Sequence, residues 1–116
     1  MIVWKETDRL DKIVQEILRQ IPKNEYKMRS QIDNASDSIG SNFVEGYYSG
    51  SLGDYIRFCR YSRRSCAELY ERIRRVLRKG YINKILFNNF EDCNIKTGYL
   101  YDRLIKSLVN KKNFKS

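Results

Sequence analysis

The sequence predicts an all-α protein folded as an antiparallel up-and-down four-helix bundle. Apolar residues recur at spacings of three and four along four successive stretches, the breaks between these stretches are short, and no alternating run is bounded by a hairpin turn. The chain has 116 residues, of which 41% are hydrophobic, enough for one domain with a buried core. We expect a single bundle domain over residues 1–110 and a basic, frayed tail over residues 111–116.

The first predicted helix covers residues 5–21. Its apolar face consists of Leu10, Ile13, Val14, Ile17, Leu18 and Ile21. These spacings of three and four residues place all six side chains on one face of a helix. Pro22 follows directly and disfavours helical geometry at the residue before it, so the helix should end there.

The second predicted helix covers residues 24–48. Its apolar positions are Met28, Ile32, Ala35, Ile39 and Phe43. Gly40 lies among small residues at the centre, where glycine costs up to about 1 kcal/mol relative to alanine. We therefore expect a bend or a close approach to a neighbouring backbone at this position. Residues 46–53 form the clearest loop of the chain, with Ser49 or Ser51 as the cap of the next helix.

The third and fourth predicted helices cover residues 52–79 and 83–109. The third carries the strongest pattern, with one broad face formed by Leu52, Tyr55, Cys59, Ser62, Cys66, Leu69, Tyr70, Ile73 and Leu77. Gly80 follows its basic last turn and is a typical C-cap. The apolar residues of the fourth are Leu86, Phe90, Cys93, Leu100, Leu104 and Leu108. Four such stripes joined by short loops bury one another most simply in an antiparallel bundle.

The composition argues against an enzyme. The chain contains no histidine, so the commonest general base and metal ligand are missing, as are Ser-His and Cys-His nucleophiles. No phosphate-binding glycine loop is present. Asp33 and Asp37 are four residues apart and are interpreted as a solvated pair, whereas Cys59 and Cys66 are interpreted as small apolar core residues. We expect no catalytic site, no cofactor and no metal.

The sequence also favours a cytoplasmic location without membrane contact. No apolar run approaches the ~20 residues that span a bilayer. The first residues lack the layout of a signal peptide. Three cysteines without a CxxC pair are a poor disulfide framework and fit a reducing compartment.

The net charge of +9 is confined to the second half of the chain. Residues 1–50 carry seven basic and eight acidic groups, whereas residues 51–116 carry sixteen basic and six acidic groups. Such an excess is typical of proteins that bind a polyanion such as RNA or DNA. A soluble bundle with an arginine-rich outer face remains the alternative.

Much of this charge lies on the outer face of the third predicted helix. The candidate nucleic-acid contacts are Arg57, Arg60, Tyr61, Arg64, Arg75, Arg78 and Lys79. Arginine binds phosphate oxygens with a forked pair of donors, and an exposed tyrosine can stack on a base. Two other interpretations stay open: contact with another subunit, and a solvated face in which Arg64 pairs with Glu68 and Glu71 with Arg75.

Three short motifs between residues 38 and 69 resemble a known family. They are SIGSNFVEG from Ser38 to Gly46, DYIRF from Asp54 to Phe58, and SCAEL from Ser65 to Leu69. In order and spacing they are similar to the four-helix-bundle family named for 23S rRNA intervening-sequence proteins. That family typically carries SIPSNIAEG, an acidic-aromatic pair before Arg-Phe, and Ser-x-x-Glu.

The resemblance spans nearly the whole chain, with three departures. Trp4 and the segment 80–82 also fit the family pattern. Gly40 stands in place of the usual proline, the bulkier pair at residues 43–44 replaces Ile-Ala, and Ser62 replaces a small alanine. The motif positions that carry over to this chain are Asn42, Glu45, Gly46, Arg57, Phe58, Ser65 and Glu68.

The resemblance implies a non-enzymatic bundle that assembles into a ring of five subunits. A related branch, the accessory variability proteins of diversity-generating retroelements, binds a reverse transcriptase and nucleic acid through a basic surface. Glu45 and Arg57 flank the loop at residues 46–53, so we expect a charge-assisted pair between them. Arg57 and Glu68 lie off the core stripe and are candidates for a subunit interface.

Taken together, these observations predict a non-enzymatic, homo-oligomeric bundle that binds RNA or DNA through its arginine-rich surface as an accessory factor. The alternative is a structural or protein-interaction module whose basic face docks a protein partner, which by resemblance would be a reverse transcriptase. The two differ in one property, because phosphate contacts make nucleic-acid binding fall steeply with added salt.

Overall fold

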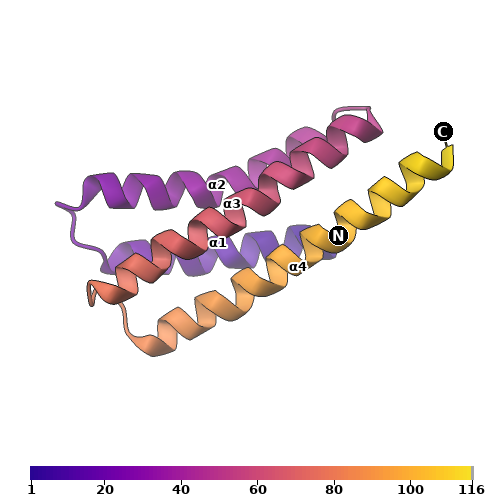
Figure 1. Ribbon diagram of the computed structural model, residues 1–116. Coiled ribbons are helices and arrows are strands. Elements are labelled where there is room, and N and C mark those ends of the chain that lie inside the picture. Colours follow the sequence, from indigo (N-terminus) through magenta and orange to yellow (C-terminus); the bar gives the residue numbers. More distant parts are fainter. Residues whose placement is uncertain (116) are drawn as a thin grey trace.

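The computed structural model describes residues 1–115, which form four helices. They are α1 (Ile2–Gln20), α2 (Tyr26–Tyr47), α3 (Leu52–Arg78) and α4 (Lys84–Lys115). Consecutive helices run in opposite directions, with the short loops at alternate ends of an elongated bundle (Figure 1). Each helix contacts two neighbours, in the order α1, α2, α3, α4 and back to α1. The predicted all-α four-helix fold is therefore confirmed.

The helix ends follow the local signals in the sequence. Ile21, which precedes the proline, has an extended backbone with φ −83° and ψ 131°. The side chain of Ser51 accepts a hydrogen bond from the backbone N–H of Asp54 at 3.3 Å and caps α3. Gly80 ends the same helix at φ +78°, in the left-handed region that glycine adopts readily. Within residues 1–115, no helix combines the length and apolar character needed to cross a membrane.

α4 ends later than the predicted fourth helix, which covered residues 83–109. The helix continues to Lys115, so residues 111–115 are helical, while Ser116 lies outside the described residues. Leu108 is buried, which anchors the last turns in the bundle. A Cβ placed on Gly53 would lie 3.4 Å from Nζ of Lys112, so the last turns of α4 run beside the start of α3. Lysines near a helix C-terminus also offset its negative dipole end.

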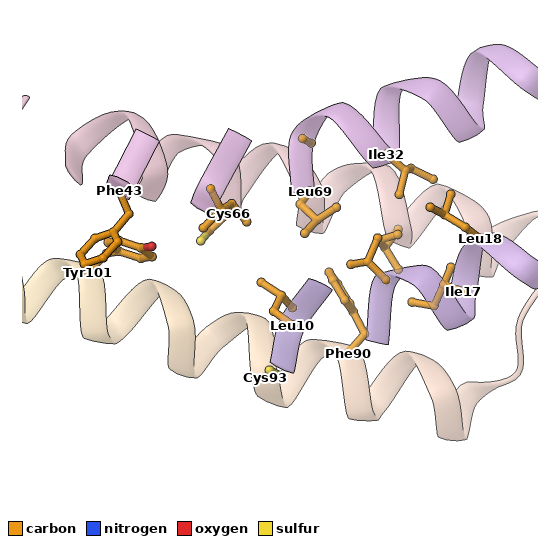
Figure 2. Close-up of a cluster of buried hydrophobic side chains, with 14 of the residues drawn as sticks. Leu10, Ile17, Leu18, Ile32, Phe43, Cys66, Leu69, Phe90, Cys93 and Tyr101 are labelled. Atoms are coloured by element: carbon orange, nitrogen blue, oxygen red, sulfur yellow. The ribbon is translucent and has the colours of Figure 1, made fainter. Parts of the chain in front are cut away.

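The core runs along the bundle axis and draws on all four helices (Figure 2). Its fully buried members include Leu10 and Ile17 of α1, Ile32 of α2, Leu69 of α3 and Phe90 of α4. The predicted apolar faces of the first three helices therefore point inward. Ile56 and Val76 of α3 are also buried, although the predicted face did not include them.

The inward face of α4 contains the predicted residues and is broader than predicted, since Leu86, Phe90, Cys93 and Leu108 are buried. Leu100 and Leu104 are half-buried, whereas Tyr101 and Ile105 are buried. The hydroxyl of Tyr101 shares a hydrogen bond with Oγ1 of Thr7 at 2.9 Å, so its polar end is satisfied inside the core. This partner comes from α1, and apolar spacing along α4 could not reveal it.

The cysteines occupy the core, as predicted for Cys59 and Cys66. All three are buried with free thiols. Burial raises the pKa of Cys66 to about 12 and that of Cys59 to about 11. Both thiols are therefore protonated at neutral pH and are poor nucleophiles. Asp33 and Asp37 are exposed, as the interpretation of a solvated pair requires.

Candidate nucleic-acid interface

All seven predicted contact residues are exposed on the outer face of α3 and its C-cap, at Arg57, Arg60, Tyr61, Arg64, Arg75, Arg78 and Lys79. The cations form two clusters. The N-terminal cluster consists of Arg57, Arg60 and Arg64. The C-terminal cluster consists of Arg75, Arg78 and Lys79. Glu68 and Glu71 separate the clusters, whose centres are roughly 25 Å apart at the rise of an α-helix.

The predicted ion pairs of this face are wrong. Arg57 pairs with Asp54, one turn earlier in the same helix, at 3.2 Å. Glu45 points into a groove between α1 and α2 instead. Glu71 pairs with Arg74 at 3.7 Å rather than with Arg75. Arg57 thus pairs with an acidic residue three positions away on its own helix and not with Glu45 across the loop. The pair within one helix forms more easily because no second segment has to be ordered.

The basic surface extends from α3 onto α4, which the sequence analysis missed. The two helices are neighbours (Figure 1). Nε of Arg63 donates to both carboxylate oxygens of Asp102, at 3.0 and 3.1 Å, and ties the helices together. We define the α3–α4 basic surface as the exposed cations Arg57, Arg60, Arg64, Arg74, Arg75, Arg78, Lys79, Lys84, Arg103 and Lys106.

The net charge of the bundle lies on this side. α3 carries eight arginines against three carboxylates, and α4 carries seven cations against three. α1 carries four of each sign, and α2 carries two cations and three carboxylates. Because α3 and α4 are adjacent, two neutral or acidic helices form one side of the molecule and two basic helices the other.

Two exposed tyrosines accompany the arginines on the basic side. Tyr61 is 37% exposed and has the guanidinium of Arg64 5.8 Å from its ring centroid. Tyr99 of α4 is 55% exposed, with Arg103 at the same distance. The Tyr99 hydroxyl also accepts a hydrogen bond from Arg103 at 3.2 Å. An aromatic ring beside a cation is a suitable platform for a nucleic-acid base.

The opposite side of the bundle carries an acidic groove between α1 and α2. Its pocket measures about 440 Å³, and four carboxylates line it: Asp8, Asp11, Asp37 and Glu45. At one end it joins an apolar patch with exposed side chains, formed by Trp4, Val44, Tyr47 and Tyr48. These four acids could not be grouped from the sequence, because they come from two helices.

Comparison with known proteins identifies the family. The family model for 23S rRNA-intervening sequence proteins matches residues 1–102. The chain belongs to this family. A protein of unknown function from the S23 ribosomal protein family of Bacteroides thetaiotaomicron has a solved structure with a TM-score of 0.82 and 20% sequence identity. The match covers 90% of this chain and 96% of that chain, and it shows a shared fold. A comparison with curated proteins gave no match.

Several motif residues of the 23S rRNA-intervening sequence family hold α2 against α3. Nδ2 of Asn42 donates to the carbonyl and the hydroxyl of Ser38, at 2.8 and 2.9 Å. The same hydroxyl lies 2.9 Å from Oγ of Ser65 on α3. A Cβ on Gly46 would lie 2.8 Å from Cβ of Phe58, so the helices approach closely there. These motif positions are structural.

The charged motif positions of the family have a different environment. Glu45, Arg57 and Glu68 are exposed. Within the described part of the chain, neither Glu45 nor Glu68 forms a side-chain hydrogen bond or ion pair. Such residues are free to meet another molecule, in contrast to the buried polar positions of the α2–α3 contact.

Proposed function

We propose that this protein binds RNA or DNA through the α3–α4 basic surface, as a non-enzymatic accessory factor. The observation that carries the proposal is the confinement of the excess charge to two adjacent helices. A long basic side can follow a phosphate backbone, and exposed Tyr61 and Tyr99 offer stacking positions for unpaired bases. Binding of this kind depends on phosphate contacts, so it carries little sequence preference.

A salt titration tests the proposal. Binding of a fluorescent single-stranded oligoribonucleotide, followed by anisotropy, should weaken linearly in log–log form as salt rises from 50 to 200 mM. The variant R78A/K106A removes one cation from each helix of the surface and should lower the slope by about two, since each lost phosphate contact lowers it by roughly one.

The matched control for this experiment removes two cations from elsewhere. Lys5 of α1 and Lys23 of the α1–α2 loop are exposed, and K5A/K23A produces the same net charge as R78A/K106A. We expect the control variant to keep the wild-type slope. No binding at 50 mM salt, or equal losses in both variants, would contradict a binding surface on α3 and α4.

We further propose that the chain works as a homo-oligomer, in which the N-terminal cluster of α3 docks in the α1–α2 groove of the next subunit and the other cations of the α3–α4 basic surface bind the nucleic acid. Arg57, Arg60 and Arg64 carry the charge opposite to that of the groove. The adjoining apolar patch, where Trp4 is 43% and Tyr48 79% exposed, supplies area that association would bury.

The geometry of the two surfaces supports a ring. Ser38 of α2 contacts Ser65 of α3, and Oγ of Ser62 donates to the carbonyl of Ile39 at 2.7 Å. The acidic groove and the N-terminal cluster therefore lie at the same level along the bundle. A head-to-tail contact between surfaces at one level adds a rotation without an axial rise, and such contacts close into a ring when the rotation divides a full turn. Five subunits would follow the family resemblance.

Charge reversal tests this assembly. We expect D37K/E45K and R57E/R64E each to abolish assembly, because each destroys one half of the contact. An equimolar mixture pairs each surface with one of opposite charge, the wild-type pair and the reversed pair, so it should co-assemble although neither variant assembles alone, which light scattering after gel filtration measures. Wild-type mass in both variants would place the interface elsewhere.

The alternative is a module whose exposed surface docks a partner protein, such as a reverse transcriptase by resemblance. The outer face of α4 favours it, because Ile85 is 73% exposed and Ile95 62% exposed beside basic residues. In this alternative the wild-type protein assembles but shows no salt-sensitive binding of RNA or DNA. The anisotropy titration therefore separates the two functions.

A further inference from the structure

A pocket of about 340 Å³ opens between α2 and α3, near the end of the bundle where α3 terminates. We call it the α2–α3 notch. Its floor is apolar and includes buried Ile32 and half-buried Met28. The remaining lining residues are polar or charged: Glu25, Lys27, Gln31, Arg72, Arg75 and Lys79.

Arg72 is held in place at the notch. Its guanidinium is half-buried, and one nitrogen donates to Oε1 of Gln31 at 2.9 Å. A guanidinium has five N–H donors in a rigid plane, so this bond fixes the orientation and leaves donors unused. Within residues 1–115, the side chains of Arg75 and Lys27 form no hydrogen bond or ion pair.

The notch already holds one anionic group of the chain. Oε2 of Glu25 accepts hydrogen bonds from the hydroxyl of Tyr81 at 2.7 Å and from Nζ of Lys79 at 2.9 Å. The Tyr81 bond, followed by the Lys79 bond, lowers the pKa of Glu25. Glu25 thus stays ionised and balances Lys79. Glu25 also attracts Arg75 without an ion pair between them. Lys27, Arg72 and Arg75 therefore keep donors for a further anion.

We propose that the α2–α3 notch binds a phosphate group, with Arg72 and Arg75 as forked donors and Lys27 as a point charge. Planar guanidinium pairs match the tetrahedral face of a phosphate, and a site with three unpaired cations needs such an anion. The proposal deepens the proposed nucleic-acid function where the phosphate belongs to a polynucleotide, because Arg75 is part of the α3–α4 basic surface. A free phosphate is the other source.

Two exposed arginines provide a matched test. Arg75 lines the notch, whereas Arg19 is exposed on α1 and belongs neither to the notch nor to the α3–α4 basic surface. We expect R75A to weaken oligoribonucleotide binding about tenfold, the loss of roughly one charged hydrogen bond, and to lower the salt slope by about one. R19A removes the same charge and should stay within about twofold of wild type. E25Q removes the competing carboxylate and should strengthen binding.

A titration with inorganic phosphate separates the two phosphate sources. In amide NMR spectra we expect shifts at Arg72 and Arg75, and R75A should remove them. If oligonucleotide binds but R75A equals R19A, and phosphate shifts no amide of the notch, the notch proposal is overturned while nucleic-acid binding stands. If no oligonucleotide binds and phosphate still shifts these amides, the notch is supported as a free-phosphate site and the proposed function fails.

Discussion

Gly46 shows how one residue sets the distance between two helices. A Cβ at this position would lie 2.8 Å from Cβ of Phe58, 3.2 Å from the carbonyl oxygen of Tyr55 and 3.3 Å from its Cα. Two of these three atoms are backbone, so the space cannot open by a side-chain rotation. The glycine of the family motif is therefore a packing requirement of the α2–α3 contact.

We predict that G46A lowers the free energy of unfolding by roughly 1–3 kcal/mol, the usual effect of overpacking a tight contact. Chemical denaturation with urea measures it. G40A is the matched control on the same helix. There the new Cβ would lie 3.6 Å from Thr7 and 3.7 Å from Trp4, which is ordinary contact.

The expected result for G40A has the opposite sign. Replacing a glycine inside a helix by alanine stabilises it by up to about 1 kcal/mol when the space is free. A G46A protein as stable as the wild type, or a G40A protein destabilised as much as G46A, would show that the helix contact at Gly46 is no tighter than that at Gly40. From the sequence, Gly40 was expected at a close approach and Gly46 in a loop, because the contact that constrains Gly46 comes from another helix.

At the scale of elements, the helix ends could be predicted because their causes are local. Pro22 disfavours helical geometry at Ile21, the residue before it. Ser51 accepts a hydrogen bond from the N–H three residues later, and Gly80 adopts a positive φ directly after α3. The burial of Tyr101 and the end of α4 could not be predicted, because Tyr101 finds its hydrogen-bond partner on α1 and the last turns lie beside α3.

The cap of α3 offers a prediction at this scale. S51A removes the acceptor for the N–H of Asp54 and should lower the stability by about 1 kcal/mol. S51D keeps an oxygen acceptor and adds a negative charge at the positive end of the helix, so it should match the wild type or exceed it. An equal loss of stability in both variants, measured by thermal or urea unfolding, would show that the Ser51 cap does not stabilise α3.

At the scale of the whole molecule, the sequence located the charge in the second half of the chain but not the groove that complements it. The excess of positive charge is found by counting charged residues along the sequence, and the antiparallel order of the helices places α3 beside α4. The acidic groove needs two helices to meet with Asp8 and Asp11 facing Asp37 and Glu45. The α2–α3 notch likewise combines Gln31 with Arg72, which lie far apart in the sequence. Such sites are visible only once the packing is known.

The one-sided charge makes a last prediction about stability and salt. Ten exposed cations on two neighbouring helices repel one another, and this repulsion is nearly unscreened at 0.01 M salt, where the Debye length is about 30 Å. At 0.1 M salt the Debye length falls to about 10 Å, so the repulsion between these cations is weaker. We therefore expect Tm to rise between 10 and 150 mM sodium chloride, by several degrees if the repulsion amounts to about 1 kcal/mol.

The variants R78A/K106A and K5A/K23A show whether the salt dependence of Tm is caused by the position of the cations or by the net charge. R78A/K106A and K5A/K23A have equal net charge, so repulsion set by net charge alone would flatten the salt dependence of both equally. Repulsion within the α3–α4 basic surface flattens it in R78A/K106A and leaves K5A/K23A close to wild type. A wild-type Tm that falls with salt would mean that surface ion pairs, such as Arg63 with Asp102, outweigh the repulsion between like charges.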